Sequence, residues 1–458
     1  MALDKAFYTK GSIGKMMFKT ALAMLAGTVA LSFYQIVDTY FVGKLGTGPL
    51  AAMGFTLPVV MICGCVFRGV YAGIMTLCAQ AIGSSDHKRA EEIVNSGFYL
   101  ALTLSIVLAV LGKLTAPIIF VRLGAEGETL MMVLEYMDIW FLGVASGMLG
   151  LLGGDLLITV GDTKMASLTM ILGTVLNMIL DYLMIFGHAG FPCLGIKGAA
   201  LATVIAQAIS LIVSWSLLWK KYEIIKWKPL PLSKMLEHWK KELRFGLPVM
   251  LGSVIMPLGQ TVVTRAAANF GDAAVAAMGA VNRLESLAFM VPMSVGFALT
   301  PMAGQNYGAG LYDRLKRCYK IANTFAFTYL LVVAAILCLV APLLVAQFSE
   351  DPDVSHLMRC GLYIISWGFG LLEIHRYSTF FLTGCGRPGM GASLNIFRVI
   401  ILHIPLTLLA VYFDKVLWLF WGRLIADVIA GLTSLFCSGL MIWKLSKKGE
   451  ICNANEPL

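Results

Sequence analysis

Two carboxylates lie inside apolar stretches of this chain, where charged residues are rare. Asp38 is near the end of an apolar segment that runs from about Thr20 to Gly43, and Asp181 is near the end of another, shortly before Gly187. A charge at bilayer depth costs about 2.5 to 3.5 kcal/mol on insertion scales, so such an Asp normally faces a partner, an ion or a water-filled cavity. The alternative for Asp38 is a solvated residue just beyond the end of its helix.

The two carboxylates are expected to lie at similar depth, because Asp38 precedes Gly43 by five residues and Asp181 precedes Gly187 by six. Two carboxylates in one dry pocket cannot both stay charged at low free energy, so the pair can take up a proton or hold a hard monovalent cation. Asn177 lies four residues before Asp181, on the same helix face. It can complete the pocket or form an interhelical hydrogen bond.

The composition is that of a protein that crosses the membrane several times. Of 458 residues, 59% are hydrophobic and only 13% are charged, which is outside the range of soluble domains. The net charge of +9 comes mainly from Lys and Arg in certain loops, so it indicates membrane orientation and not nucleic-acid binding. No phosphate-binding loop of the GxxxxGK[ST] type occurs, which argues against ATP as an energy source.

Twelve apolar segments are long enough to span a bilayer; they begin near residues 20, 48, 93, 129, 165, 198, 245, 273, 318, 354, 390 and 416. The sequence therefore predicts an all-α membrane protein. Lys and Arg are concentrated in alternate connections, and the positive-inside rule places both termini in the cytoplasm. We divide the chain into an N-terminal lobe at 1–219, a cytoplasmic connecting loop at 220–244 and a C-terminal lobe at 245–458.

The two lobes are copies of one unit. Leu50-Ala-Ala-Met-Gly54 matches Val275-Ala-Ala-Met-Gly279 at an offset of 225 residues (275 − 50). After one deleted residue, the stretch 198–206 matches 422–430 in the same way. Because each copy holds an even number of spans, both insert in the same direction. This arrangement predicts two pseudo-symmetric six-helix lobes with a central cleft, as in alternating-access transporters.

Several short motifs resemble one known family in their order, spacing and duplication. They are Asp38-Thr-Tyr-Phe-Val-Gly-Lys-Leu-Gly46, Ala79-Gln-Ala-Ile-Gly-Ser84, Asn177-Met-Ile-Leu-Asp181 and Pro301-Met-Ala-Gly-Gln-Asn-Tyr-Gly-Ala-Gly310. The chain resembles the multidrug and toxic compound extrusion (MATE) family from about residue 15 to 445. The resemblance implies export of amphipathic, often cationic compounds driven by inward Na⁺ or H⁺, with no further cofactor. It also implies a cation site formed by Asp38, Asn177, Asp181 and Thr203.

The second lobe lacks this pair of carboxylates, since Asp38 aligns with Val263 and Asp181 with Leu406. We therefore expect cation coupling in the first lobe. Many members of the family carry a proline in the first helix, where this chain has Ala23 and its second copy has Pro248. A bending mechanism that depends on proline is not expected here, because Ala favours a continuous helix.

Other polar residues in apolar segments are secondary candidates. Gln35, Asp155, Gln260 and Glu285 could line the substrate cleft, although helix packing or an interfacial position explains them nearly as well. Asp427 is a further candidate. The pairs Glu373 with Arg376 and Arg423 with Asp427 are spaced three and four residues apart, so we expect structural ion pairs there.

We therefore expect a secondary-active antiporter of the cell membrane that acts as a monomer on small organic substrates and binds no nucleic acid. The alternative is a lipid-linked oligosaccharide flippase, which would need several cations for a diphosphate. The first lobe offers chiefly Arg68 and Lys113. An enzyme is not expected, because no nucleophile with a neighbouring base is visible.

Overall fold

The computed structural model describes residues 7–227 and 230–454, without the side chains of Gln35 and residues 448–454. All regular structure in these ranges is helical. The first half contains η1 (Phe7–Thr9), α1 (Ile13–Lys44), α2 (Thr47–Gly83), α3 (His87–Arg122), α4 (Gly127–Thr159), α5 (Thr163–Phe186), η2 (His188–Gly190) and α6 (Ile196–Lys220). The second half contains α7 (Leu232–Ala268), α8 (Asp272–Ala288), α9 (Met290–Gly308), α10 (Tyr312–Phe348), α11 (Pro352–Ile365), η3 (Ser366–Gly368), α12 (Phe369–Gly384), α13 (Pro388–Ile396), η4 (Phe397–His403), α14 (Ile404–Tyr412) and α15 (Trp418–Ala454).

Within the described residues, eleven helical segments are long and apolar enough to cross a membrane. α8 and α9 pass the same test only when they are taken together, and they are bent by 57° at their junction. Counted as one broken span, the pair brings the number of spans to twelve. Pro292 accounts for the break, since it has no N–H to donate to the carbonyl of Ala288. The predicted all-α membrane fold is confirmed.

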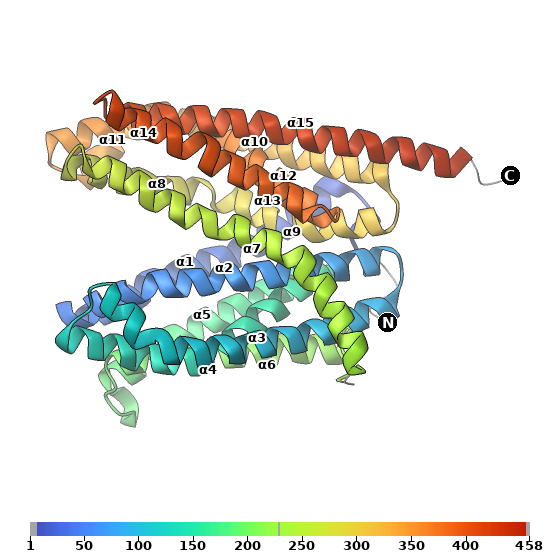
Figure 1. Cartoon of the computed structure of the whole chain (residues 1–458), viewed down its shortest axis with the longest axis horizontal. Helices are drawn as coiled ribbons and strands as arrows, with labels where there is room; N and C mark the ends of the chain where they lie inside the picture. The colour runs from blue at the N-terminus through green and yellow to red at the C-terminus, as the bar shows by residue number, and fades with distance from the viewer. Residues whose placement is uncertain (1–6, 228–229, 455–458) are drawn as a thin grey trace. The chain divides into compact units, whose positions relative to one another are not determined.

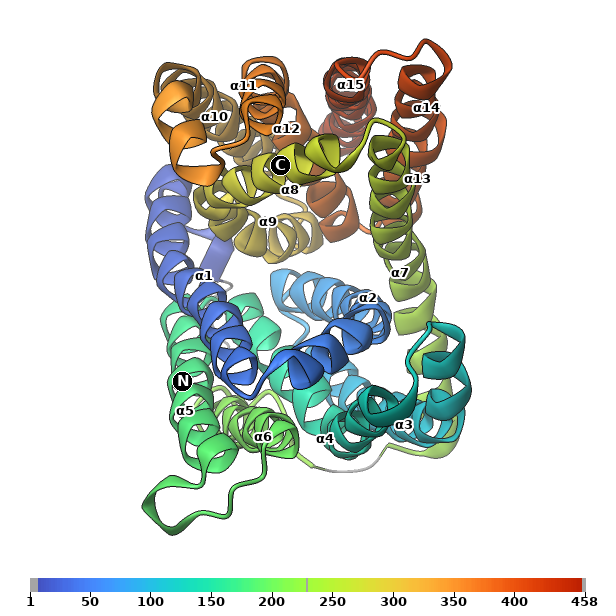
Figure 2. The same cartoon turned by 90° about the vertical axis from the view of Figure 1, so that its left-hand side faces the viewer.

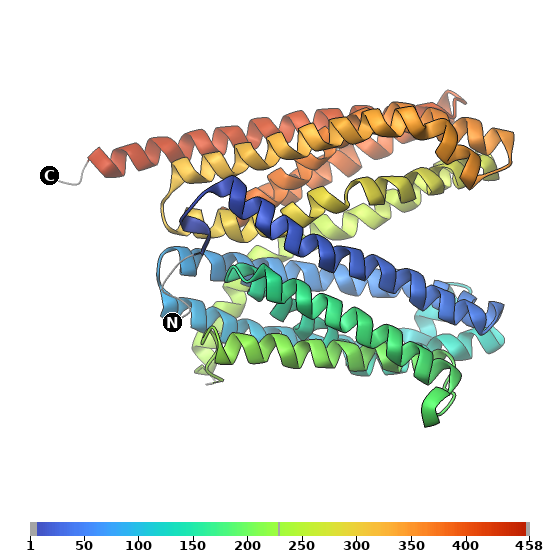
Figure 3. The same ribbon diagram turned by 180° about the vertical axis from the view of Figure 1, so that it is seen from behind.

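The chain divides into two compact units (Figure 1). Unit 1 takes in Leu22–Gly246 with Phe7, and unit 2 takes in Tyr8–Ala21 with Leu247–Leu458. Both α1 and α7 contribute to each unit, because each helix crosses the boundary. In unit 1, α6 packs along α4 and α5, and Figure 3 shows α5 and α6 side by side, joined by a loop that projects beyond the helix ends.

Helix boundaries in the two halves repeat at the predicted offset. α2 spans Thr47–Gly83 and the α8–α9 pair spans 272–308, which are the same positions plus 225. α3 and α10 begin at His87 and Tyr312, and α4 and α11 begin at Gly127 and Pro352. The duplication seen in short sequence motifs therefore extends to the whole arrangement of helices.

The structure differs from the expected boundaries in the connection between the halves. Residues 232–244, expected within a connecting loop, form the first turns of α7. This stretch is amphipathic and packs on unit 1, where Trp239 donates from Nε1 to the carbonyl of Ser96 at 3.1 Å. Lys234 pairs with Glu92 on α3 at 2.5 Å. These polar contacts with α3 hold residues 232–244 as part of α7, and the periodicity of the sequence does not reveal them.

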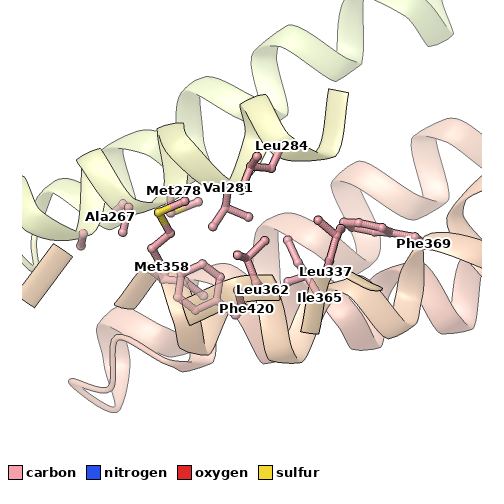
Figure 4. Packing of buried hydrophobic residues seen from close by; sticks show 14 of the residues in the cluster. Ala267, Met278, Val281, Leu284, Leu337, Met358, Leu362, Ile365, Phe369 and Phe420 are labelled. Atoms are coloured by element: carbon pink, nitrogen blue, oxygen red, sulfur yellow. The ribbon is translucent and has the colours of Figure 1, made fainter. Parts of the chain in front are cut away.

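Unit 2 has a large core of interdigitating aliphatic and aromatic side chains (Figure 4). Met278, Val281 and Leu284 of α8 face Met358 and Leu362 of α11. Figure 2 looks nearly along the axes of α10 and α15, while α8 runs obliquely across the view. Such packing fixes the rotation of each helix about its axis, and so decides which polar side chains point inward.

Candidate cation site in unit 1

Asp38 lies one and a half turns before the end of α1 and is buried, with 6% of its surface exposed. Its Oδ1 atom has no hydrogen-bond partner among the described residues. A buried carboxylate oxygen that no protein donor satisfies is unfavourable for the charged form. Asp38 is therefore buried within α1, and is not a solvated residue beyond the helix end.

Asp181, on α5, is fully buried and is held by one amide. In the orientation that pairs both ends of the Asn177 amide, its Nδ2 donates to Asp181 Oδ2 at 2.8 Å. The Asn177 oxygen then accepts from the hydroxyl and the backbone N–H of Thr203, each at 3.2 Å. Asn177 thus links Asp181 on α5 to Thr203 on α6. The other oxygen of Asp181 has no hydrogen-bond partner in the described part of the chain.

The structure brings together all four residues that the family resemblance implied. Asp38 acts electrostatically on Asp181, and Thr203 is buried beside Asn177. Each carboxylate keeps one oxygen free of hydrogen bonds to the described residues. Free acceptor oxygens of two nearby carboxylates are suited to a shared proton or to a hard monovalent cation.

Two tyrosines extend the group and were missed by sequence reasoning. The hydroxyl of Tyr34 on α1 lies 3.4 Å from Thr203 Oγ1, and Tyr136 on α4 is buried within electrostatic range of Asp38 and Asp181. Tyr34 precedes Asp38 by one helical turn, so the spacing could have suggested it. Nothing in the sequence distinguishes Tyr136 from the other aromatic residues of the apolar segments.

Asp155 is not part of this group. It is half-buried near the end of α4, and the charge that acts on it is that of Arg68 on α2. The hydroxyl of Tyr71, also on α2, donates to the carbonyl of Met148 at 2.9 Å on the same helix as Asp155. The charges of Asp155 and Arg68 therefore act on each other inside unit 1, apart from the group around Asp38 and Asp181.

Two of the other candidates for a substrate cleft, Gln260 and Glu285, belong to unit 2. Gln260 is exposed on α7 in unit 2, and the side chain of Gln35 is outside the described part of the structure. Glu285 on α8 accepts two hydrogen bonds from Arg423 of α15, at 2.5 and 2.6 Å. This carboxylate is neutralised by a partner, unlike those of Asp38 and Asp181.

The equivalent place in unit 2 is occupied by ion pairs. Val263 and Leu406 replace the two carboxylates, but Asp427 aligns with Thr203. Arg398, in the π-helical turn η4, pairs with Asp427 at 2.7 Å, and both residues are buried. A carboxylate already matched by an arginine has little remaining attraction for a cation, so the two units differ chemically at the same point of the repeat.

The predicted structural ion pairs are both present. Glu373 pairs with Arg376 at 3.0 Å within α12. Asp427 also lies 3.7 Å from Arg423, one turn away on α15. Both expected ion pairs within α12 and α15 are therefore confirmed.

A duplicated helical bundle with eleven or twelve spans in the described residues, and with a buried pair of carboxylates in one repeat, defines a polytopic membrane transporter. The MatE family model matches residues 23–183 and 248–409, once in each half. The chain belongs to the MATE family of transporters.

Similar proteins support this assignment over nearly the whole chain. An FAD transporter of Shewanella oneidensis is 31% identical over 94% of this chain and 96% of its own. A probable multidrug resistance protein NorM of Thermotoga maritima is 24% identical over 91% and 90%. Among solved structures, a MATE transporter of Vibrio cholerae has a TM-score of 0.88 at 25% identity, covering 94% of this chain and 97% of that one.

Proposed function

We propose that this protein is a secondary-active exporter that moves amphipathic organic compounds outward in exchange for inward Na⁺ or H⁺. The observation that carries the proposal is the buried pair Asp38 and Asp181, each with one oxygen that no described residue satisfies. Asn177, Thr203 and Tyr34 supply the surrounding oxygens and donors. Relatives named as multidrug resistance or multidrug export proteins supply the substrate class.

The coupling rests on charge. Two carboxylates repel each other strongly in a medium of low dielectric constant, and binding of one cation or proton weakens this repulsion. The protein with the ion bound therefore favours a different conformation from the protein with the charged pair. If the substrate binds these two conformations with different affinity, ion binding changes the affinity for the substrate. Substrate binding then changes the affinity for the ion by the same factor. We place the Lys- and Arg-rich loops and both termini on the cytoplasmic side.

The test is transport by the purified chain in liposomes. Ethidium efflux is driven by an imposed Na⁺ gradient and, separately, by a pH gradient. We expect one gradient to drive efflux and Asp38→Asn or Asp181→Asn to abolish it. Asp138→Asn is the matched control, because Asp138 is in the same unit but its side chain is 52% exposed. Efflux by Asp38→Asn at the rate of the control would overturn the proposed coupling site.

Flavin nucleotides are a second candidate substrate. The FAD transporter is 31% identical to this chain, whereas one relative named as a multidrug resistance protein and one named as a multidrug export protein are each 24% identical. FAD is also amphipathic, with a flat aromatic ring system, but it is an anion. The same liposomes loaded with FAD in place of ethidium separate the two candidates, since a flavin exporter moves FAD under the coupling gradient and leaves ethidium inside.

The flippase alternative has less support from the site. Lys113 lies 3.6 Å from Asp138, and Arg68 acts on Asp155. Lys113 is thus next to a carboxylate and Arg68 acts on the charge of another, and these carboxylates repel the anionic headgroup that both cations would have to bind.

A further inference from the structure

Unit 2 contains a groove of about 710 Å³ that lies between α10, α12 and α15, outside the groups considered above. The three helices contact one another, and α10 and α15 run side by side in Figure 1. The groove has a cationic end and an apolar end. The cationic end is formed by the start of α10 and the last turns of α15.

Three lysines line the cationic end: Lys316 and Lys320 on α10, and Lys447 on α15. All three are exposed, and none pairs with a carboxylate of the described residues. The ammonium group of Lys447 lies 4.2 Å from the ring centroid of Trp443, which orients it at the mouth of the groove. Three unpaired cations around one opening attract an anionic ligand.

The rest of the wall is mostly apolar, although Asn323, Thr324 and Thr328 of α10 also line it. Phe327 on α10 and Leu435 on α15 line the groove away from the lysines. Phe327 follows Lys316 by eleven residues (327 − 316), so it lies about 16 Å further along the helix at the usual rise per residue. A ligand that fills the groove must be anionic at one end and apolar over roughly that length.

We propose that this groove binds an anionic phospholipid. The phosphate of its headgroup contacts Lys316, Lys320 and Lys447, and an acyl chain lies along Phe327 and Leu435. The cationic mouth is formed by segments next to a Lys- and Arg-rich connection and the C-terminal tail, which the positive-inside rule places at the leaflet rich in anionic lipid. Lipid bound here would contact three spans of unit 2 at once.

The test measures binding of phosphatidylglycerol and phosphatidylcholine to the purified full chain by native mass spectrometry. Replacement of Lys316, Lys320 and Lys447 together by Gln is expected to weaken phosphatidylglycerol binding on the order of a hundredfold, since each Lys near an anionic surface contributes about fivefold. Phosphatidylcholine binding should not change. Replacement of the same three residues by Arg should retain the affinity for phosphatidylglycerol. That result would verify that the triple Gln variant loses affinity because it loses positive charge.

A control of equal charge separates a specific site from general attraction. Lys88, Lys164 and Lys220 are exposed lysines of unit 1 on loops or helix ends of the same type, and their replacement by Gln should leave phosphatidylglycerol binding unchanged. Equal losses in the two triple variants would overturn the proposal. A second readout is quenching of tryptophan fluorescence by phosphatidylglycerol with brominated acyl chains. Trp443→Phe must remove part of that quenching, and unchanged quenching would also overturn the proposal.

Discussion

Asn177 is the residue on which the geometry of the candidate cation site depends. Its amide donates to Asp181 and accepts from Thr203, so one side chain joins α5 and α6 and leaves the second oxygen of Asp181 available. The hydroxyl of Thr203 in turn can accept from Tyr34. At the residue scale the site is a chain of hydrogen bonds from Tyr34 through Thr203 and Asn177 to Asp181, with Asp38 acting on Asp181 through its charge, and its members can be tested one by one.

Tyr34→Phe removes only the hydroxyl that contacts Thr203. Because one hydrogen bond contributes about 1 kcal/mol net, we expect the half-saturating concentration of the coupling ion to rise about fivefold, with the maximal efflux rate retained. Tyr40→Phe is the control on the same helix, since Tyr40 is exposed and its ring would still face Lys44. Identical ion dependence of the two variants would count against a role for Tyr34.

Asp162 caps α5 and is the clearest pH-dependent group outside the spans. Burial alone would raise the pKa of Asp162, but its contacts with Lys221, Tyr222 and the backbone N–H of Met165 outweigh that effect and lower it below the ordinary value. Lys221 lies 2.7 Å away. The stabilisation from this charge is therefore present above about pH 4, the ordinary range of Asp, and is lost as the pH falls through the lowered value.

Asp162→Asn keeps a good helix cap but removes the charge. We expect a loss of about 1 kcal/mol at pH 7, since Lys221 is half exposed to solvent. The difference in stability should begin to shrink near pH 4 and disappear as the pH falls through the lowered pKa of Asp162. Thermal unfolding of both in detergent between pH 7 and 3 measures this. Asp86→Asn is the control, because Asp86 caps α3 through the N–H of Arg89 and makes no ion pair with a described residue.

At the scale of helices, the first turns of α7 lie directly against α2. A methyl group added at Gly73 would come within 2.3 Å of the carbonyl oxygen of Glu242, and one added at Gly246 within 2.6 Å of the carbonyl of Gly69. Only the absence of side chains allows this approach. The two glycines therefore fix how the segment that joins the halves lies on unit 1.

Gly73→Ala should destabilise the protein by about 1 to 3 kcal/mol, because the added methyl group meets backbone and cannot be accommodated by a change of rotamer. The measurement is the thermal unfolding temperature in detergent. Gly64→Ala on the same helix is the control, because nothing lies within 4 Å of the added atom there. If both substitutions had the same effect, the close contact of α2 and α7 would not be the cause.

At the scale of the whole molecule, the number of spans depends on the bent pair α8 and α9. If the pair crosses the membrane as one broken span, the connections at 124–126 and 349–351 lie on the same side. If it instead re-enters from one face, they lie on opposite sides. The even number of spans required for two parallel repeats favours the first arrangement.

Reporter insertions decide between these arrangements. Alkaline phosphatase is active only outside the cytoplasm, and we expect activity when it is inserted in either 124–126 or 349–351. Insertion at 309–311, between α9 and α10, should be inactive. Activity at 309–311 together with inactivity at 349–351 would mean that the pair is re-entrant and that the chain has eleven spans.

The sequence alone was sufficient for the fold class, the duplication and the two carboxylates. Uninterrupted apolar runs, a fixed offset between short motifs and a charge within an apolar run are all local signals, and each has a direct physical cause in the bilayer. Asp38, Asp181 and Asn177 could be singled out in this way. The four-residue spacing of Asn177 and Asp181 already placed both on one face of a helix.

Tertiary packing decided the rest. Tyr136 belongs to the carboxylate group only because α4 packs beside α6. Asp427 forms an ion pair with Arg398 from a different helix. Lys316 and Lys447 line the same groove between α10 and α15. Each of these contacts joins residues far apart in the chain and depends on the rotation of one helix against another. Apolar periodicity in a membrane helix specifies that rotation weakly, because nearly every face is apolar, so interdigitation of side chains has to determine it.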